Sequence, residues 1–168
     1  MAKIRAQFVS KMVRKVLADS QIKEPPVDLV RILKFQGIQY EEVEDFPDSV
    51  DALIIEDGEK VYAAVNARQH LHRRRFSLAH ELGHYFLHRD GPTQDLVDID
   101  NPPADEIGSE SKGPAEIEAD LFAGELLVPL DMLRKHVSEG IPSISKIFVV
   151  SEQVVAIAIS RHMRQLFK

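Results

Sequence analysis

The sequence predicts an α+β fold in which a small antiparallel sheet is combined with several helices. Two observations predict it: apolar residues spaced three and four apart in both halves of the chain, and three short extended runs between residues 38 and 66. The length of 168 residues is close to the roughly 150 of one compact domain, and the apolar fraction of 44% is near the globular average of about 45–50%. We therefore expect one core of ordinary size.

The first 66 residues are predicted to form two helices followed by strands. Apolar spacing predicts helices over 8–18 and 26–36, the second bounded by Pro26 and Gly37. From Ile38 the pattern becomes extended and predicts three strands, which read IQYEEV, DALIIED and KVYAAVN. We interpret them as a small, mainly antiparallel sheet.

The rest of the chain is predicted to be mostly helical. One helix covers 71–88, a second contains AEIEADLFAGELLVP, and shorter ones cover 130–138, 143–148 and 152–166. Residues 90–114 hold seven acidic residues against one lysine, with four prolines and three glycines, and predict an acidic loop. That loop is either a solvent-exposed loop without a role in the site or a lid that contacts the substrate. A calcium site in it is disfavoured because the glycine and terminal glutamate of an EF-hand loop are missing. Its candidate ligands would be Asp95, Asp98 and Asp100. We predict a main domain over 1–130, with a small helical unit over 131–168 packed on it.

Composition excludes several kinds of chemistry. Without cysteine there is no disulfide framework, no thiolate nucleophile and no sulfur-bound zinc, so a metal would take nitrogen and oxygen ligands. A net charge of −6 argues against broad binding to nucleic acid. The basic N-terminus lacks the apolar core of a signal peptide, and no apolar run approaches the roughly 20 residues of a membrane span. We expect a soluble, cytoplasmic protein.

The stretch HELGH carries the clearest chemical pattern. His80 and His84 are four apart on a predicted helix, so their side chains lie on one face and can turn ring nitrogens to one metal ion. Glu81 projects roughly 100° round the helix from His80, beside such an ion, where a general base is useful. The alternative is a surface helix with two histidines and a coincidental glutamate.

A third ligand is needed, because a catalytic zinc normally takes three protein ligands. Glu116 and Asp120 share one helix face, whereas Glu118 lies about 200° round from Glu116 and should point away. We predict Glu116 as the ligand and Asp120 as the carboxylate that accepts a hydrogen bond from a ligand histidine. The alternative, a solvated acidic face, is disfavoured by the apolar FAGELLVP that follows.

The two blocks RFSLAHELGHYFLH and EIEADLFAGELLVP resemble the ImmA/IrrE family of zincin-like metallopeptidases. The similarity runs in order from about residue 26 to residue 160. It implies a zincin-like fold with one zinc ion per chain, held by His80, His84 and, as in gluzincins, a glutamate, Glu116. It also implies that Glu81 is the catalytic acid and base. Relatives in this family are cytoplasmic bacterial or phage-encoded proteins that cleave or otherwise inactivate helix-turn-helix repressors, so a repressor is the expected protein substrate.

Other parts of such a site are less determined. Tyr85, His88 and Arg75 are candidates to stabilise an oxyanion, but each has an equally good structural explanation: packing, a helix C-terminus, or solvation of the Arg73–Arg75 run. His88 is too far along the helix to bind the same ion. An extended substrate is expected to add as a strand beside residues 60–66.

Two other classes of function compete with a peptidase. The C-terminal ISKIFVVSEQVVAIAISRHM predicts a helix-turn-helix-like unit with Ser151 as an N-cap, which would suit DNA binding. The start of its second helix is acidic or apolar, so we favour packing or partner docking and expect no direct contact with nucleic acid. The other class is a non-cleaving anti-repressor or a toxin–antitoxin partner on the same fold.

Overall fold

The computed structural model describes residues 4–89 and 113–167. The Asp28 side chain caps α2 by accepting a hydrogen bond from the backbone N–H of Arg31 at 2.9 Å, so this helix begins at Leu29 and not at Pro26. The acidic segment 90–112, with its candidate calcium ligands, lies outside the described residues. The elements in chain order are α1 (Ala6–Asp19), α2 (Leu29–Phe35), β1 (Gln39–Val43), β2 (Ala52–Asp57), β3 (Lys60–Asn66), α3 (Leu71–His88), α4 (Pro114–Leu127), α5 (Leu130–Leu133), a 3-10 turn (Val137–Glu139), α6 (Ile141–Phe148) and α7 (Glu152–Leu166).

The three strands form one mixed sheet in the order β1-β3-β2. β2 and β3 make an antiparallel hairpin whose turn contains Gly58, at a φ of +62°. β1 pairs with β3 in parallel, so the expected antiparallel sheet is wrong for this strand. Segment 44–51 carries the chain past β3 to the far edge of the sheet, and a pattern of apolar residues cannot reveal which neighbour a strand will take.

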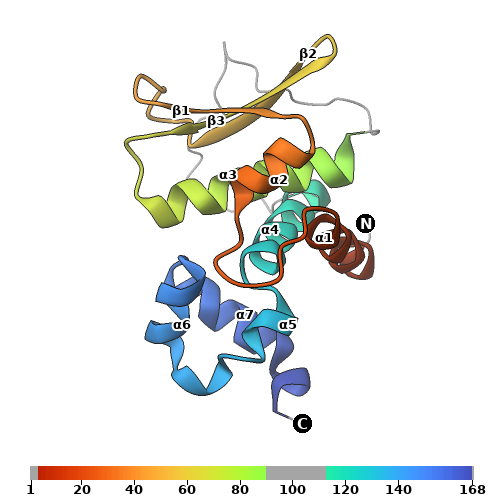
Figure 1. The fold of residues 1–168 in the computed structure, drawn as a ribbon, viewed down its shortest axis with the longest axis vertical. Coiled ribbons are helices and arrows are strands. Elements are labelled where there is room, and N and C mark those ends of the chain that lie inside the picture. The colour runs from red at the N-terminus through yellow and green to blue at the C-terminus, as the bar shows by residue number, and fades with distance from the viewer. Residues whose placement is uncertain (1–3, 90–112, 168) are drawn as a thin grey trace.

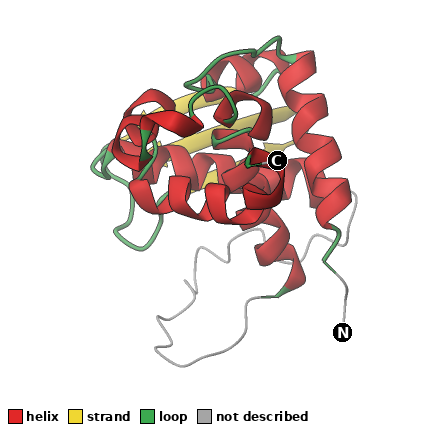
Figure 2. Cartoon of the chain, turned by 90° about the horizontal axis from the view of Figure 1, so that it is seen from below, coloured by secondary structure: helices red, strands yellow, loops and turns green. Residues whose placement is uncertain are grey.

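Helices cover one face of the sheet, and the core lies between these two layers (Figures 1 and 2). α3 lies against β2 and β3, and β3 buries Val61, Ala63 and Val65 on alternate positions. α4 and α1 lie beyond α3, farther from the sheet (Figure 1). Leu82 of α3 and Phe122 of α4 are fully buried. The helix that carries HELGH is therefore held between the sheet and a second layer of helices.

Gly83 allows α3 and α4 to approach closely. A Cβ atom at this position would lie 2.9 Å from the Cα of Ala119 and 3.1 Å from its carbonyl oxygen, closer than side chains tolerate. Glycine inside a helix costs up to about 1 kcal/mol relative to alanine, and this contact explains why the position carries it. Gly83 thus packs directly against α4, the helix that carries Glu116.

Ion pairs at its two ends align α3 with an edge strand. Near the start of the helix, Arg73 donates two hydrogen bonds to the Asp51 carboxylate, at 2.8 and 2.9 Å. Just beyond its end, Arg89 pairs with Glu56 at 2.9 Å. Asp51 precedes β2 and Glu56 lies within it, so β2 runs beside α3 in the same direction.

The other two arginines of the run are partly buried and also have partners, so the expected solvation is wrong for Arg74 and Arg75, whereas Arg73 is exposed. Arg74 pairs with Glu42 of β1. Arg75 donates to the carbonyl oxygen of Val149 at 3.1 Å and to that of Val27 at 3.0 Å. A side chain of α3 thus links the N-terminal helices to the break between α6 and α7.

Of the C-terminal helices, α7 contacts α4, and α6 contacts α7. α6 and α7 are separated by residues 149–151, and their directions differ by 108°. Ser151 caps α7 by accepting a hydrogen bond from the Val154 N–H at 3.3 Å, as predicted. Val155 and Ala158 are buried. The division of the chain at residue 130 stays a prediction.

No single helix in the described part of the chain is both long and apolar enough to cross a membrane. By length and composition alone, α6 and α7 would pass only if they were counted together as one bent pair.

Candidate metal centre

Two helices bring the predicted ligands together. His80 and His84 lie one turn apart on α3, and Glu116 lies in the first turn of α4, which packs along α3. The two Nε2 atoms are 3.1 Å apart, and they lie 3.2 Å (His80) and 3.1 Å (His84) from the Glu116 carboxylate oxygens. Residues separated by more than 30 positions in the sequence thus present three donor atoms to one point.

The spacing of these atoms suits a small divalent ion. Ligand atoms about 2.0–2.1 Å from a tetrahedral zinc ion lie roughly 3.3 Å from one another. Each of the three residues offers one donor atom, and all three atoms lie within 4.8 Å of one another. Lone pairs this close repel unless a proton or a cation lies between them. The residues present therefore fit a bound metal, and His80, His84 and Glu116 could hold it.

Asp120 fixes the ring of His80. Its carboxylate lies 2.9 Å from Nδ1 of His80, one helical turn beyond Glu116 on α4. When the proton is on Nδ1 and this N–H donates a hydrogen bond to the Asp120 carboxylate, Nε2 keeps a free lone pair directed at Glu116 and His84. The structure therefore places Asp120 where the sequence predicts it.

Interactions within the cluster favour an ionised Glu116 beside a protonated His80. Hydrogen bonds from His80 and His84 hold the pKa of the Glu116 carboxyl well below its usual range, against the opposing effect of burial. Burial alone would lower the pKa of His80, but the hydrogen bond to Glu116 and the charges of Glu116, Glu81 and Asp120 outweigh it and raise that pKa. Glu116 is thus a carboxylate that the fold keeps ionised and that attracts positive charge.

Glu81 sits beside the cluster in a drier environment. Burial raises the pKa of its carboxyl, although the neighbouring His84 and His80 act in the opposite direction. A carboxyl whose pKa is moved toward neutrality can both accept and return a proton. The structure brings Glu81 to the edge of the three-ligand group, as the position of HELGH on one helix predicts.

A second charged cluster on the same helices was not anticipated. Glu118 points away from the three candidate ligands His80, His84 and Glu116, which we call the metal cluster. Its side chain is nevertheless only 3% exposed. It accepts hydrogen bonds from the backbone N–H of Arg5 at 2.7 Å and from the Arg5 guanidinium at 2.6 Å. His88 lies 3.7 Å from it. No spacing rule in the sequence links two residues 113 positions apart, although a basic residue just before an amphipathic helix was a visible hint.

The candidates for oxyanion stabilisation are engaged elsewhere. Arg75 donates to two backbone carbonyls, and the Tyr85 hydroxyl accepts a hydrogen bond from Arg89 at 2.8 Å. His88 faces Glu118 and lies outside the three-ligand group, as expected. None of these contacts is directed at the metal cluster.

The expected strand addition beside β3 is wrong. β3 is the central strand: β1 pairs with it over Tyr62–Asn66, and β2 pairs with it over Lys60–Val65. Its backbone has no free edge along most of its length. Within the described sheet, the free edges belong to β1 and β2.

Comparisons with known proteins agree with this geometry. The sequence profile of the IrrE N-terminal-like domain matches residues 51–160, which include α3 and α4. No curated protein gives a significant match. Among solved structures, a Mycobacterium tuberculosis transcriptional regulator shares the fold at a TM-score of 0.63 and 18% identity, over 92% of this chain. The chain spans 46% of the length of that regulator.

Proposed function

Because the chain belongs to the family of IrrE N-terminal-like domains, we propose that it is a zinc-dependent endopeptidase. The observation that carries this proposal is the convergence of His80, His84 and Glu116, with Glu81 next to them. The proposed fold class is zincin-like, with α3 and α4 as its two ligand helices. One ion per chain is the expected content.

A zinc ion held by these three residues would polarise a peptide carbonyl and lower the pKa of a water molecule. Glu81 then takes a proton from the water as its oxygen bonds to the carbonyl carbon, and it returns that proton to the leaving nitrogen as the C–N bond breaks. The raised pKa of Glu81 suits both halves of this transfer. Asp120 keeps the His80 ring in the tautomer and orientation that a ligand requires.

We propose that the substrate backbone pairs with the free edge of the edge strand β2. It runs beside α3 from Arg73 to Arg89, so a strand added to its free edge would pass along the metal cluster. This replaces the expectation that β3 would accept the substrate. The corresponding test is a peptide complex, in which main-chain pairing to residues 52–57 is expected.

The proposed substrate is a helix-turn-helix transcriptional repressor, whose cleavage would relieve repression. This part rests on family resemblance, and the name of the M. tuberculosis relative, a transcriptional regulator, is compatible with it. The helix-turn-helix-like α6 and α7 are proposed to dock a partner and not DNA. Glu152, an exposed carboxylate with no donor, stands at the start of α7, where a recognition helix would need donors for phosphates.

A comparison of wild type with Glu81→Gln in cells that carry a repressor-controlled reporter tests the proposal. The substitution keeps the size of the side chain and removes its basicity, so cleavage should fall by about 10²- to 10⁴-fold with metal content unchanged. The reporter should then remain repressed, with the repressor intact on a gel. Full relief by Glu81→Gln would instead identify a non-cleaving anti-repressor.

A further inference from the structure

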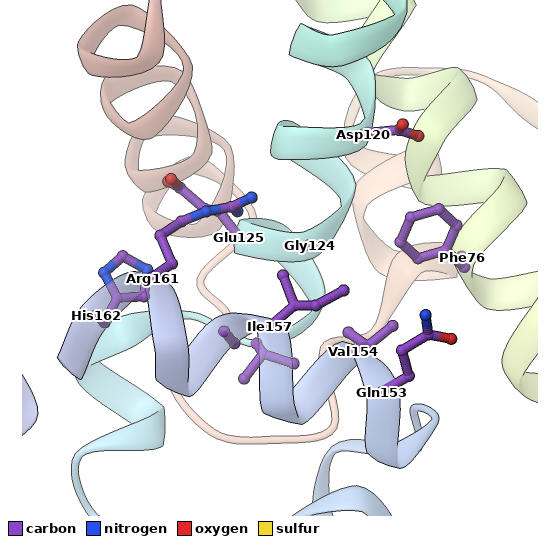
Figure 3. Close-up of a pocket in the computed structure, with 11 residues that line it drawn as sticks. Phe76, Asp120, Gly124, Glu125, Gln153, Val154, Ile157, Arg161 and His162 are labelled. Atoms are coloured by element: carbon purple, nitrogen blue, oxygen red, sulfur yellow. The ribbon is translucent and has the colours of Figure 1, made fainter. Parts of the chain in front are cut away.

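A groove lies between α4 and α7, and Asp120 forms part of its wall (Figure 3). It consists of two cavities of about 380 and 470 Å³, which share Asp120, Glu125, Arg161 and His162 in their walls. Both volumes fall in the range of about 300–1,000 Å³ that is typical of ligand pockets. The groove is therefore large enough to take a side chain of any size.

Asp120 connects this groove to the chemistry. The residue lines both cavities, and its carboxylate lies 2.9 Å from the His80 ring. In a group bound in the first cavity, the atoms that touch Asp120 would be separated from the candidate ligand His80 only by the Asp120 side chain. Asp120 is the link between the groove and the candidate metal site, since His80, His84, Glu116 and Glu81 do not line either cavity.

The first cavity has an apolar floor and a polar end. Val128 and Ala158 form buried parts of the floor, and Phe76 of α3 and Val154 border it. Ile157 is 50% exposed although it is a large apolar residue, and its side chain projects toward α4 (Figure 3). An apolar group that enters here would bury this exposed surface and gain roughly 25 cal/mol for each Å² removed from water.

Gly124 lines the groove without a side chain and so leaves more space in it. It lies within α4, where glycine costs up to about 1 kcal/mol relative to alanine. Unlike Gly83, it is not explained by close packing, since a Cβ there would meet only an Arg161 nitrogen at 3.7 Å, an ordinary contact. The missing side chain instead leaves space on the side that faces α7 and the cavity.

We propose that this groove is the specificity pocket for the substrate, and that it takes one large aliphatic or aromatic side chain of an extended peptide near the cleaved bond. The proposal rests on the proposed function, because it assumes that His80, His84 and Glu116 mark the place where the peptide is cut. Ile157, Val154 and Phe76 select the apolar side chain, and the lack of a side chain at Gly124 admits its bulk.

Selection from a position-scanning library of unstructured decapeptides tests the proposal. Zinc-loaded Glu81→Gln protein is used as the binder, so that bound peptides stay intact. We expect enrichment of Leu, Met or Phe at a single position. Adding Gly124→Leu, which fills the groove from α4, should lower this preference at least tenfold and shift it toward Ala or Gly. Ile157→Arg should also abolish it, which guards against a fold defect in one variant.

Ala156→Leu is the matched control, because it adds a similar side chain to an exposed position of α7 that does not line the groove. It should leave the preference unchanged, and all variants should keep one zinc. An unaltered preference in Gly124→Leu and Ile157→Arg would overturn the proposal. So would a failure to retain any peptide, or enrichment at helical i and i+4 spacing, which would indicate a docked helix.

Cleavage of the enriched peptides by protein with Glu81 intact separates the two proposals. If the peptides are cut but Gly124→Leu leaves the preference unchanged, the peptidase stands and the pocket is overturned. If the peptides bind with a preference that Gly124→Leu alters but they are never cut, the pocket stands and the peptidase fails.

Discussion

Two clusters of histidine and glutamate lie on the same pair of helices, and they differ in the source of positive charge. Glu118 is buried and bound to Arg5, a cation that the chain supplies itself. Glu116, two residues earlier, is 48% exposed, and within the described residues it is paired only with the imidazoles of His80 and His84. The Glu118 cluster is therefore neutralised within the chain and is expected to act as a structural anchor. The Glu116 cluster contains no lysine or arginine, so a bound metal ion is the expected source of its positive charge.

The two clusters are neighbours with separate contacts. Glu118 ties the N-terminal half of α4 to Arg5, the residue that precedes α1, by accepting hydrogen bonds from it. Glu116 lies in the first turn of the same helix and contacts the histidines of α3 instead. Arg5 touches none of the three candidate ligands, so its pair with Glu118 is expected to stabilise the fold and not the metal site.

Asp120→Asn should weaken the metal cluster and spare the anchor. The amide holds the His80 ring less strongly than a carboxylate does, and loss of such a partner typically costs about 10- to 100-fold in metal affinity. Competition titration with a chromogenic chelator measures this change. Glu118→Gln is the control on the same helix and should stay within about threefold of wild type. Equal losses in both variants would contradict the separation of the two clusters.

Glu118→Gln should weaken the anchor and spare the metal. The variant keeps the shape of the side chain but loses charged hydrogen bonds to Arg5, which should lower the free energy of unfolding by about 1–2 kcal/mol. The figure is modest because the Arg5 side chain is half exposed and can be solvated. Urea denaturation with and without zinc measures it, and the loss should be similar in both conditions. A loss that disappears when zinc is added would show that Glu118 acts through the metal site.

Dependence on pH should distinguish the clusters in metal-free protein. His80 has a raised pKa, so its pairing with Glu116 contributes fully below the ordinary histidine pKa and is lost as the pH rises through the raised value. Hydrogen bonds from Arg5 lower the pKa of Glu118, so its contribution is present above the ordinary glutamate pKa and is lost only as the pH falls through the lowered value. Arg5 stays protonated at alkaline pH.

The destabilisation caused by Glu116→Gln should therefore be present near pH 5.5 and absent at pH 9, whereas that caused by Glu118→Gln should be the same at both. Urea denaturation of both variants at the two pH values, with chelator present, provides the measurement. This effect should be the smallest of the three, at about 1 kcal/mol or less. A Glu116→Gln penalty of equal size at both pH values would contradict the expected loss of the pairing as His80 is deprotonated.

The sequence predicts the placement of the three candidate ligands well, because most of their spacing is set within single helices. Four-residue spacing puts His80 beside His84 and Glu116 beside Asp120, and only the docking of one helix on another remains to be guessed. The anchor and the sheet order depend on contacts between distant segments. Neither Arg5 with Glu118 nor β1 beside β3 leaves a periodic signal, so the first was missed and the second was predicted wrongly.

The arginine run illustrates the same limit. Three consecutive arginines read as a solvated helix start, yet Arg75 donates hydrogen bonds to the backbone carbonyls of two segments that are far apart in the sequence. A sequence shows that a charge is present, but its burial depends on which segments fold against it. The residues most open to prediction were those whose partners lie within one helical turn.

Metal content and affinity of the purified protein test the central claim most directly. Wild type and Glu118→Ala would be compared with His80→Ala and Glu116→Ala by mass spectrometry and competition titration. The expected result is one zinc ion per chain in the first two proteins and loss of tight binding in the other two. No bound ion in wild type under conditions that reload zinc enzymes, or undiminished binding in Glu116→Ala, would contradict the account. Glu81 would then be an ordinary half-buried carboxylate, and the chain would be better regarded as a binding module.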